Sequence, residues 1–221
     1  MPTSQLYQIP KVVECIVAAD PATILDIGVG FGKYGFLARE YLEVWDHSKP
    51  YSTFTRRIDG IEIFPDYLTP IHTFVYDEVF RGDAREVVPK LERSYDLVLA
   101  VDVLEHFSAE EGRMLLETML ARNRGVLVSV PRDLGEQEDV FGNEHEAHHA
   151  LWSVKDFKAL SPLVHFRDRT SVIVYLAGEK DLRRLRQALR KRKVWRLTSA
   201  SPRASALVRA VSRWRKPPAT A

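Results

Sequence analysis

Four acidic side chains follow apolar runs in the sequence, at Asp26, Glu62, Asp83 and Asp102. Each run has the composition of a buried strand, and the carboxyl ends of parallel strands meet at one edge of a sheet. We therefore expect the four carboxylates to surround one crevice. Such a crevice suits a ligand that carries ribose hydroxyls and positive charge, and it repels a pyrophosphate.

Glycine occupies every second position directly after the first apolar run, at Gly28, Gly30 and Gly32. Residues without a Cβ atom let the backbone bend tightly and approach a bound ligand, so residues 24–32 are predicted to form a strand, a glycine loop and a helix start. Residues 30–35 also satisfy the GxGxxG pattern of dinucleotide binders, so the loop alone does not identify its ligand. Together with the four acids, it favours S-adenosylmethionine.

Residues 9–177 resemble the class I S-adenosylmethionine-dependent methyltransferases, including uncharacterised bacterial ones. Asp26 with the three glycines is similar to the first motif of that family, Glu62 to its ribose-binding acid, and residues 102–106 (DVLEH) to its fourth-strand signature. The resemblance implies that the ribose of S-adenosylmethionine binds Glu62. It implies that the adenine lies beside Ile63 and near Asp83 and Ala84. It also implies that the methionine part lies near Asp26, Gly28, Gly30 and Asp102.

The spacing of the motifs departs from the family in one place. Asp26 and Glu62 are 36 residues apart, whereas about 20 is usual. The extra length coincides with residues 45–56, which look like an insertion, and we expect this segment to contribute to the choice of acceptor.

A long polar loop, residues 131–152, follows the fifth predicted strand and contains three of the seven histidines. Long loops in compact domains are often functional, and this one should cross the edge of the sheet where methyl transfer would occur. Within it, Glu146, His148 and Trp152 match positions of a run found in uncharacterised bacterial methyltransferases.

Methyl transfer to a hydroxyl requires a group that removes the proton, and His148 is the predicted base. Glu146 or Glu105 could orient it and stabilise its charged form. His106 is a further catalytic candidate because it directly follows Glu105. The alternatives are that the loop histidines form a solvated surface, and that residues 105 and 106 only cap a helix or form an ion pair.

The same residues suggest a possible metal site. Asp102, Glu105, His106 and His148 offer the oxygen and imidazole ligands that suit Mg²⁺ or Mn²⁺. The arrangement is similar to that of metal-dependent small-RNA 2′-O-methyltransferases, although their first acid is replaced by aspartate and their denser His/Asp/Phe run is absent. We favour the hypothesis without a metal.

Apolar runs alternate with amphipathic stretches through residue 177, which predicts an α/β fold. We expect a doubly wound, mostly parallel, seven-stranded sheet that ends in an antiparallel hairpin. The predicted helices are 9–19, 32–44, 84–92, 109–121 and 153–160, and the predicted strands are 22–27, 57–63, 78–82, 95–101, 124–130, 163–167 and 171–177.

The net charge of +2 divides unevenly along the chain. Residues 179–221 contain 14 Lys and Arg against two acids, a net charge of +12, so residues 1–178 carry −10. We predict a cofactor-binding domain over 1–178 and a basic amphipathic helical tail over 179–221. The tail suits an anionic membrane surface, nucleic acid or an acidic protein, or else it is solvated or docks on the acidic body.

Composition narrows the compartment and the class of protein. A single cysteine, Cys15, excludes an internal disulfide and a cysteine-based zinc site. The amino-terminal residues do not have the pattern of a leader peptide, and no stretch is apolar enough to span a membrane. We expect a cytoplasmic protein, with the tail allowing peripheral contact with the inner membrane surface.

The leading hypothesis is an S-adenosylmethionine-dependent methyltransferase acting on a small-molecule, glycan or lipid-linked acceptor, at oxygen. Two alternatives are kept: a metal-assisted RNA 2′-O-methyltransferase, and a non-catalytic ligand-binding or tethering module. A nicotinamide dehydrogenase is disfavoured because no cluster of basic residues faces the expected pyrophosphate position.

Overall fold

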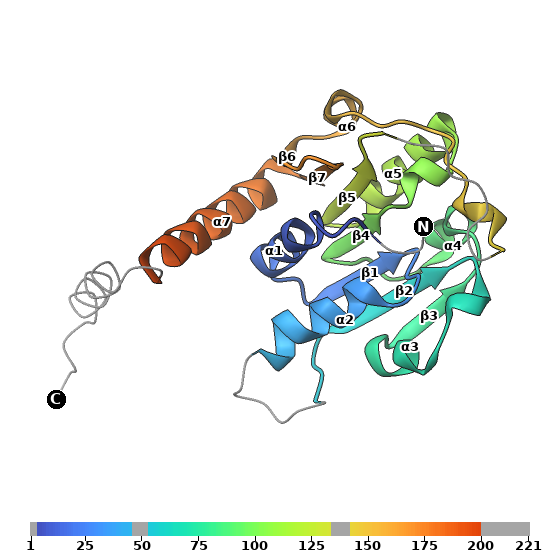
Figure 1. The fold of residues 1–221 in the computed structure, drawn as a ribbon, viewed down its shortest axis with the longest axis horizontal. Helices are drawn as coiled ribbons and strands as arrows, with labels where there is room; N and C mark the ends of the chain where they lie inside the picture. Colours follow the sequence, from blue (N-terminus) through green and yellow to red (C-terminus); the bar gives the residue numbers. More distant parts are fainter. Residues whose placement is uncertain (1–3, 46–52, 134–141, 200–221) are drawn as a thin grey trace.

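A seven-stranded sheet forms the centre of the computed structural model, which describes residues 4–45, 53–133 and 142–199 (Figure 1). Its order is β3-β2-β1-β4-β5-β7-β6, and only β7 runs antiparallel to its neighbours. This confirms the predicted mostly parallel sheet with an antiparallel carboxyl-terminal hairpin. The strands are Thr23–Ile27 (β1), Arg57–Glu62 (β2), Glu78–Arg81 (β3), Leu97–Val101 (β4), Gly125–Pro131 (β5), Leu163–Phe166 (β6) and Ser171–Ala177 (β7).

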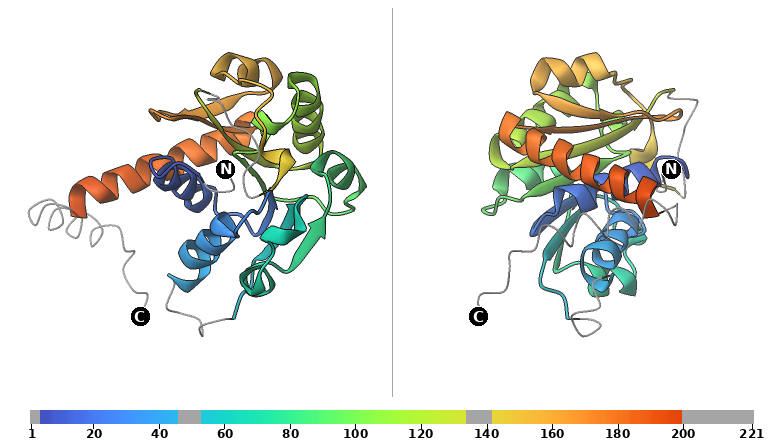
Figure 2. Two further views of the ribbon diagram at one scale, coloured as in Figure 1. Left: turned by 45° about the vertical axis from the view of Figure 1, so that its right-hand side comes forward. Right: turned by 90° about the vertical axis from the view of Figure 1, so that its left-hand side faces the viewer.

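Seven α-helices cover the two faces of the sheet within the described residues: Ile9–Ala19 (α1), Lys33–Arg39 (α2), Pro70–Val75 (α3), Ala84–Lys90 (α4), Ala109–Arg122 (α5), Val154–Leu160 (α6) and Glu179–Ser199 (α7). One apolar core joins the sheet to α1, α2, α3 and α7, and a second joins it to α4, α5 and α6. Figure 2 shows α7 lying beside α1 in the first layer. Strand β4, at the centre of the sheet, is apolar throughout because both of its faces are covered.

The ends of several helices follow from local sequence. Ser108 and Glu111 form a reciprocal capping box at the start of α5, and Ser153 and Asp156 form one at the start of α6. Each box satisfies two backbone N–H groups that the first helical turn leaves unpaired. These caps explain why both predicted helices begin within a residue of their expected positions.

Two features of the first layer differ from the sequence-based expectation. The predicted helix 32–44 is α-helical only to Arg39 and continues as a π-helical segment, Glu40–Val44. Helix α3, Pro70–Val75, was not predicted, because six residues that include β-branched Ile71, Thr73 and Val75 give a weak helical pattern.

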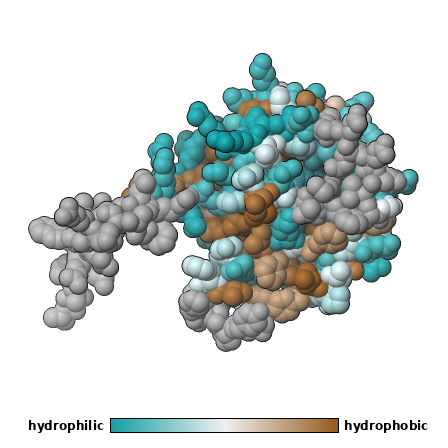
Figure 3. Space-filling model, viewed as in Figure 1, coloured by the Kyte–Doolittle hydropathy of each residue, from teal (hydrophilic) through white to brown (hydrophobic). Residues whose placement is uncertain are grey.

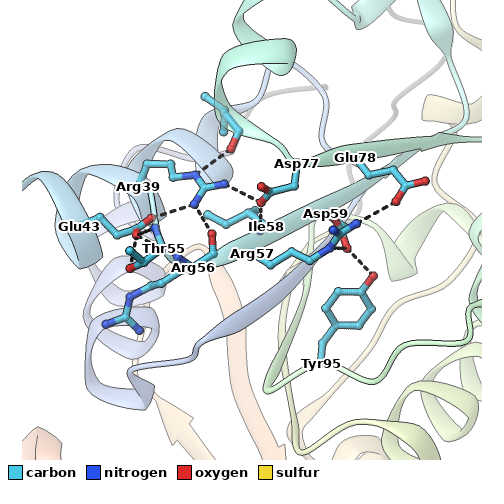
Figure 4. Close-up of polar contacts among 11 residues, drawn as sticks. Arg39, Glu43, Thr55, Arg56, Arg57, Ile58, Asp59, Asp77, Glu78 and Tyr95 are labelled. Atoms are coloured by element: carbon cyan, nitrogen blue, oxygen red, sulfur yellow. Dashed lines mark hydrogen bonds and ion pairs between the residues drawn. The ribbon is translucent and has the colours of Figure 1, made fainter. Parts of the chain in front are cut away.

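The buried guanidinium of Arg39 ties the π-helical segment to the sheet (Figure 4). It donates to Glu43 at 2.8 Å, to Asp77 at 2.8 Å and to the carbonyl oxygens of Val75 and Arg56. Glu43 in turn accepts the backbone N–H of Arg56. A buried charge of this kind is tolerated only when its donors are satisfied, so this cluster fixes where α2 ends and β2 begins.

The region predicted to be a separate basic tail begins with α7. Leu182 and Leu185 on its inner side are buried in the core shared with α1. Residues 200–221 lie outside the described part of the chain, as do residues 46–52 of the predicted insertion. Among the residues that the structure describes, every helix is too short or too polar to cross a lipid bilayer.

Candidate active site

A cavity of about 310 Å³ opens at the carboxyl ends of β1, β2 and β4. We call it the strand-end cavity. Because these strands are neighbours in the order β2-β1-β4, residues far apart in the sequence meet there. The predicted site residues among those lining it are Gly28, Gly30, Glu62, Ile63, Asp83, Ala84, Asp102, His106 and Glu146.

The glycine loop forms one wall of the cavity. Gly28 has a φ of +67°, and a Cβ atom at this position would lie 2.9 Å from Cγ2 of Val103. The N–H groups of Gly28 and Val29 donate to the carbonyl oxygen of Ile61 on β2, which holds the loop against the sheet. Only glycine fits this bend at low cost. Gly32 lies outside the cavity lining, as the N-cap of α2.

Glu62 is fixed at the end of β2 by two backbone groups. The N–H of Gly30 donates to its Oε2 at 2.8 Å, and the N–H of Phe64 donates to its Oε1 at 2.9 Å. Burial raises the pKa of Glu62, while these two hydrogen bonds oppose the rise. Each oxygen keeps a lone pair, so the carboxylate is oriented and able to accept two hydroxyl groups.

Asp26 lies beneath the cavity floor and is not among the lining residues. Its carboxylate accepts the hydroxyl of Tyr76 at 2.7 Å, and the side chain is buried. Burial raises the pKa of Asp26 to about 7, opposed by the hydrogen bond from Tyr76. The structure therefore does not place Asp26 in contact with the cavity, although the sequence analysis expected it there.

Asp102 follows β4 in a left-handed conformation, with a φ of 56°. The side-chain amide of Gln8 donates to its Oδ2 at 2.5 Å, and the hydroxyl of Ser129 donates to Oε1 of Gln8 at 2.6 Å. Burial raises the pKa of Asp102, and hydrogen bonds from Ser4 and Gln8 oppose the rise. Gln8 is fully buried, and the sequence analysis missed it because its partners are remote in the chain.

Asp83 has both roles that the sequence allowed. Its side chain accepts the N–H of Arg85 at 2.8 Å and so caps α4, and it also lines the cavity. The guanidinium of Arg85 pairs with Asp83 and with Glu111. The positive charge of Arg85 is thus balanced by two carboxylates.

Glu105, His106 and His148 come together beside the cavity, and we call them the Glu–His–His cluster. One ligand atom from each lies within 4.8 Å of the others, and the two imidazole rings are 5.2 Å apart. His106 faces the cavity, and its Nδ1 lies 3.1 Å from the carbonyl oxygen of Ala147. Burial lowers the pKa of His106. His148 and Glu105 are not among the lining residues and stand behind it.

Glu105 is fully enclosed, and its Oε2 has no hydrogen-bond partner within the described residues. Burial raises its pKa well above the ordinary value. Its backbone carbonyl accepts the N–H groups of His149 and Ala150, and the indole of Trp152 donates to the carbonyl of Leu104 at 3.2 Å. These bonds fasten the carboxyl end of the predicted loop over the end of β4.

Glu146 belongs to a second polar group on the cavity wall. The hydroxyl of Tyr67 donates to Glu146 at 3.1 Å, and the amide of Asn143 donates to the oxygen of Tyr67 at 3.3 Å. Burial raises the pKa of Tyr67 to about 12, so this hydroxyl keeps its proton near neutral pH. Tyr67 was not predicted because it stands in no motif, and Asn143, although it lies in the run that contains Glu146, was not singled out as a site residue.

The cavity is acidic. Among the described residues that line it, the permanent cations are Lys33 and Arg85, and the carboxylates are Glu62, Asp83, Asp102, Glu111, Glu144 and Glu146. Like charges in a partly enclosed space raise the energy of one another, so a cationic ligand relieves repulsion and a polyanion increases it.

Comparisons with known proteins give the fold an independent reference. No family model matches the sequence, and no curated protein matches it. Solved structures, in contrast, match the fold of the chain. An O-methyltransferase family protein from Burkholderia thailandensis superposes with a TM-score of 0.56 at 13% identity, over 78% of this chain and 57% of that one.

Two further structures that are similar to this chain contain S-adenosylhomocysteine (SAH). The amino-terminal domain of EvdMO1, solved with SAH and D-fucose, gives a TM-score of 0.51 at 14% identity over 79% of this chain and 84% of that domain. Magnesium protoporphyrin IX methyltransferase from Synechocystis PCC 6803 with bound SAH gives 0.51 at 15% identity, over 77% of this chain and 82% of that one.

These likenesses show the fold of the chain, which is the class I methyltransferase fold expected from the motifs. The chain spans a little over half the length of the first two structures it matches, 57% and 56%.

Proposed function

We propose that this chain is an S-adenosylmethionine-dependent methyltransferase that acts on a small-molecule, glycan or lipid-linked acceptor, at oxygen. The observation that carries the proposal is the strand-end cavity itself. It joins a glycine-walled bend, a backbone-fixed Glu62 and an excess of carboxylates in one space of about 310 Å³, which is within the size range of small-molecule sites.

The residues present fit this cofactor. Glu62 would accept the two ribose hydroxyls, Ile63 would pack against the adenine near Asp83 and Ala84, and Asp102 with the loop at Gly28 would face the methionine part. The cofactor supplies a methyl group bonded to a positively charged sulfur. The surrounding carboxylates would stabilise that charge, and Arg85 is already paired with Asp83 and Glu111.

The Glu–His–His cluster is the proposed proton acceptor. His106 faces the cavity, and His148 and Glu105 stand behind it. A neutral imidazole could take the proton of an acceptor hydroxyl while that oxygen bonds to the methyl carbon, the methyl–sulfur bond breaks and SAH leaves. The nearby carboxylate of Glu146 would stabilise the charged imidazole. The chain then needs only to hold that oxygen in line with the methyl group.

The charge of the cavity and the similarity of the chain to solved structures narrow the class of acceptor. The acidic cavity favours a neutral or cationic acceptor over a polyanion. Solved structures that are similar to this chain include an O-methyltransferase family protein and a domain crystallised with D-fucose, which supports oxygen and a hydroxyl-bearing acceptor.

Isothermal titration with S-adenosylmethionine and with SAH tests the proposal. Glu62→Gln should weaken binding about 10- to 100-fold, because a hydrogen bond to a charged group is worth about 1.5–3 kcal/mol. Glu144→Gln, which changes another carboxylate of the cavity lining, is the matched control and should change affinity much less. Indifference of the wild-type chain to both compounds would refute the assignment.

A second candidate is methyl transfer assisted by a divalent metal, and the Glu–His–His cluster favours it. One carboxylate and two imidazoles are a donor set that first-row divalent cations accept. A bound cation would lower the pKa of an acceptor hydroxyl and position it. The acidic cavity weakens the RNA form of this hypothesis, because it repels a polyanion. Residues 134–141 of the adjoining loop lie outside the described part of the chain.

Label transfer from S-adenosylmethionine distinguishes the two candidates. A metal-assisted enzyme should be stimulated by Mn²⁺ and inhibited by a chelator, and His148→Ala should abolish the stimulation. An RNA acceptor predicts labelled RNA under the same conditions. If the chain binds SAH tightly yet labels no acceptor across a broad panel, a non-catalytic binding module is the better description.

A further inference from the structure

Helix α7 carries a dense cluster of exposed positive charge. Arg183, Arg190, Lys191, Arg192 and Lys193 are exposed, and no carboxylate of the described residues lies within ion-pair distance of them. The two acids of the helix, Glu179 and Asp181, are already paired with arginines near its start. Figure 1 shows the second half of α7, which carries residues 190–193, extending past the body of the domain.

The same helical layer exposes large apolar side chains. Phe36 on α2 is 49% exposed, and Ile71 and Phe74 on α3 are 50% and 47% exposed. Trp45, at the end of the π-helical segment, is 69% exposed. Figure 3 shows apolar side chains gathered over this part of the surface. Monomeric proteins rarely group exposed aromatic and aliphatic side chains without a binding role.

Helices α1, α2, α3 and α7 share one core and cover one face of the sheet. We propose that this helical layer docks on an anionic lipid bilayer, with the exposed basic residues of α7 held near the headgroups by their charge and the exposed residues of α2 and α3 entering the interface. Basic residues near such a surface are attracted to its negative charge, and Trp, Phe and Ile are stabilised at the boundary between headgroups and acyl chains.

A bilayer fits these observations better than nucleic acid does. Both are anionic, but an RNA acceptor would have to enter the strand-end cavity, whose carboxylates outnumber its cations among the described lining residues. A bilayer need only touch the outer layer. It also gives the exposed Phe36, Ile71 and Phe74 an apolar environment, which a phosphate backbone does not.

The layer reaches the edge of the strand-end cavity. The ring of Phe31 packs against that of Tyr67 with centroids 5.2 Å apart, and Tyr67 lines the cavity. Phe31 is itself 47% exposed. The contact between Phe31 and Tyr67 would bring a membrane-borne acceptor close to the site, and this step rests on the proposed methyltransferase function. The docking itself does not depend on that function.

Sedimentation of the full chain with vesicles tests the proposal. The chain should pellet with vesicles that mix phosphatidylglycerol into phosphatidylcholine, and not with phosphatidylcholine alone, and added salt should release it. Combining R190E, K191E, R192E and K193E should lower the partition coefficient at least about tenfold. Phe36→Ser with Phe74→Ser should weaken the part of the binding that survives high salt.

A matched control changes the same number of charges on the opposite layer, through K90E, R113E, K155E and K158E. These exposed residues lie on α4, α5 and α6, and their reversal should leave vesicle binding within about twofold of the wild type. SAH titration of each variant shows whether it is folded and keeps the methyltransferase question separate. Equal loss in both charge variants, absence of phosphatidylglycerol dependence, or binding to single-stranded RNA in place of vesicles would overturn the proposal.

Discussion

At the scale of single residues, the candidate site depends on groups that position its carboxylates. Gln8 is the clearest example, because its amide joins Asp102 to Ser129 across the floor of the cavity. The contact spans 94 residues of sequence. No local pattern could indicate it, and a buried glutamine before the first helix has no signature of its own.

Gln8→Ala should weaken SAH binding about tenfold, because Asp102 loses a hydrogen bond worth roughly 1.4 kcal/mol and is free to turn. Gln5→Ala, which replaces an exposed residue one turn earlier, is the control and should bind as the wild type does. Titration calorimetry measures both. Equal affinity in the Gln8 variant would show that Asp102 needs no such support.

Asp26 gives the stability of the protein a specific dependence on pH. Its pKa in the folded chain is about 7, against an ordinary value of 3.8. The folded state therefore binds the proton more tightly than the unfolded state, and this contribution to stability is present below about pH 4 and lost as pH rises through 7.

Asp26→Asn lacks this dependence while still accepting the hydroxyl of Tyr76. The free energy of unfolding of the variant should gain on that of the wild type by up to about 1.4 kcal/mol per pH unit between pH 5 and 7. Urea titrations at several pH values measure the difference. A difference that is constant with pH would contradict the environment described for Asp26.

At the scale of elements, the turn between β1 and α2 positions the cavity wall. Gly28→Ala would place a methyl group 2.9 Å from Val103 in a left-handed backbone. We expect a loss of about 1–3 kcal/mol in the free energy of unfolding, together with weaker SAH binding. Gly178→Ala, whose added methyl would meet nothing within 4 Å, should be close to neutral in both measurements.

The π-helical segment depends on a buried charge. Arg39→Met removes the donors to Glu43 and Asp77 and leaves the buried carboxylate of Glu43 without its countercharge. The expected cost is about 3–5 kcal/mol in chemical denaturation. Arg113→Met, which breaks an exposed pair with Glu117, should cost less than about 0.5 kcal/mol. Similar costs for the two would show that the Arg39 cluster does not hold the segment.

At the scale of the whole molecule, one helical layer and the strand-end cavity differ in charge. The layer of α1, α2, α3 and α7 presents basic and apolar groups, whereas the strand-end cavity concentrates carboxylates. The uneven charge noted in the sequence thus has a spatial counterpart, with the acidic groups at the site and the basic ones on α7.

The sequence could predict elements that have a regular apolar pattern or clear boundary residues. Strand β4 and residues 172–177 of β7 were predictable because they are continuously apolar. The strand-end acids were predictable because parallel strands share an edge. The short helix α3 could not be predicted, since its residues favour a helix only weakly. The depth of Asp26 was also hidden, because a strand-end position does not tell whether a side chain faces the ligand or the helix behind it.

The candidate catalytic residues show the same limit. The motif placed Glu105 and His106 after β4, but their approach to His148 depends on backbone bonds from His149 and Ala150 to Glu105. Any sequence can form backbone hydrogen bonds of this kind, so no sequence pattern indicates them. The meeting of these three side chains was therefore a hypothesis from resemblance, and the structure supplies the distances.

A crystal structure of the full chain with SAH tests the central claim most directly. We expect the ribose hydroxyls of SAH to bind the carboxylate of Glu62, and the adenine to lie beside Ile63. We expect the amino-acid part of SAH to face Asp102, and His106 to face the sulfur. A cavity that stays empty at saturating SAH, or a bound SAH whose ribose lies away from Glu62, would contradict the proposed function.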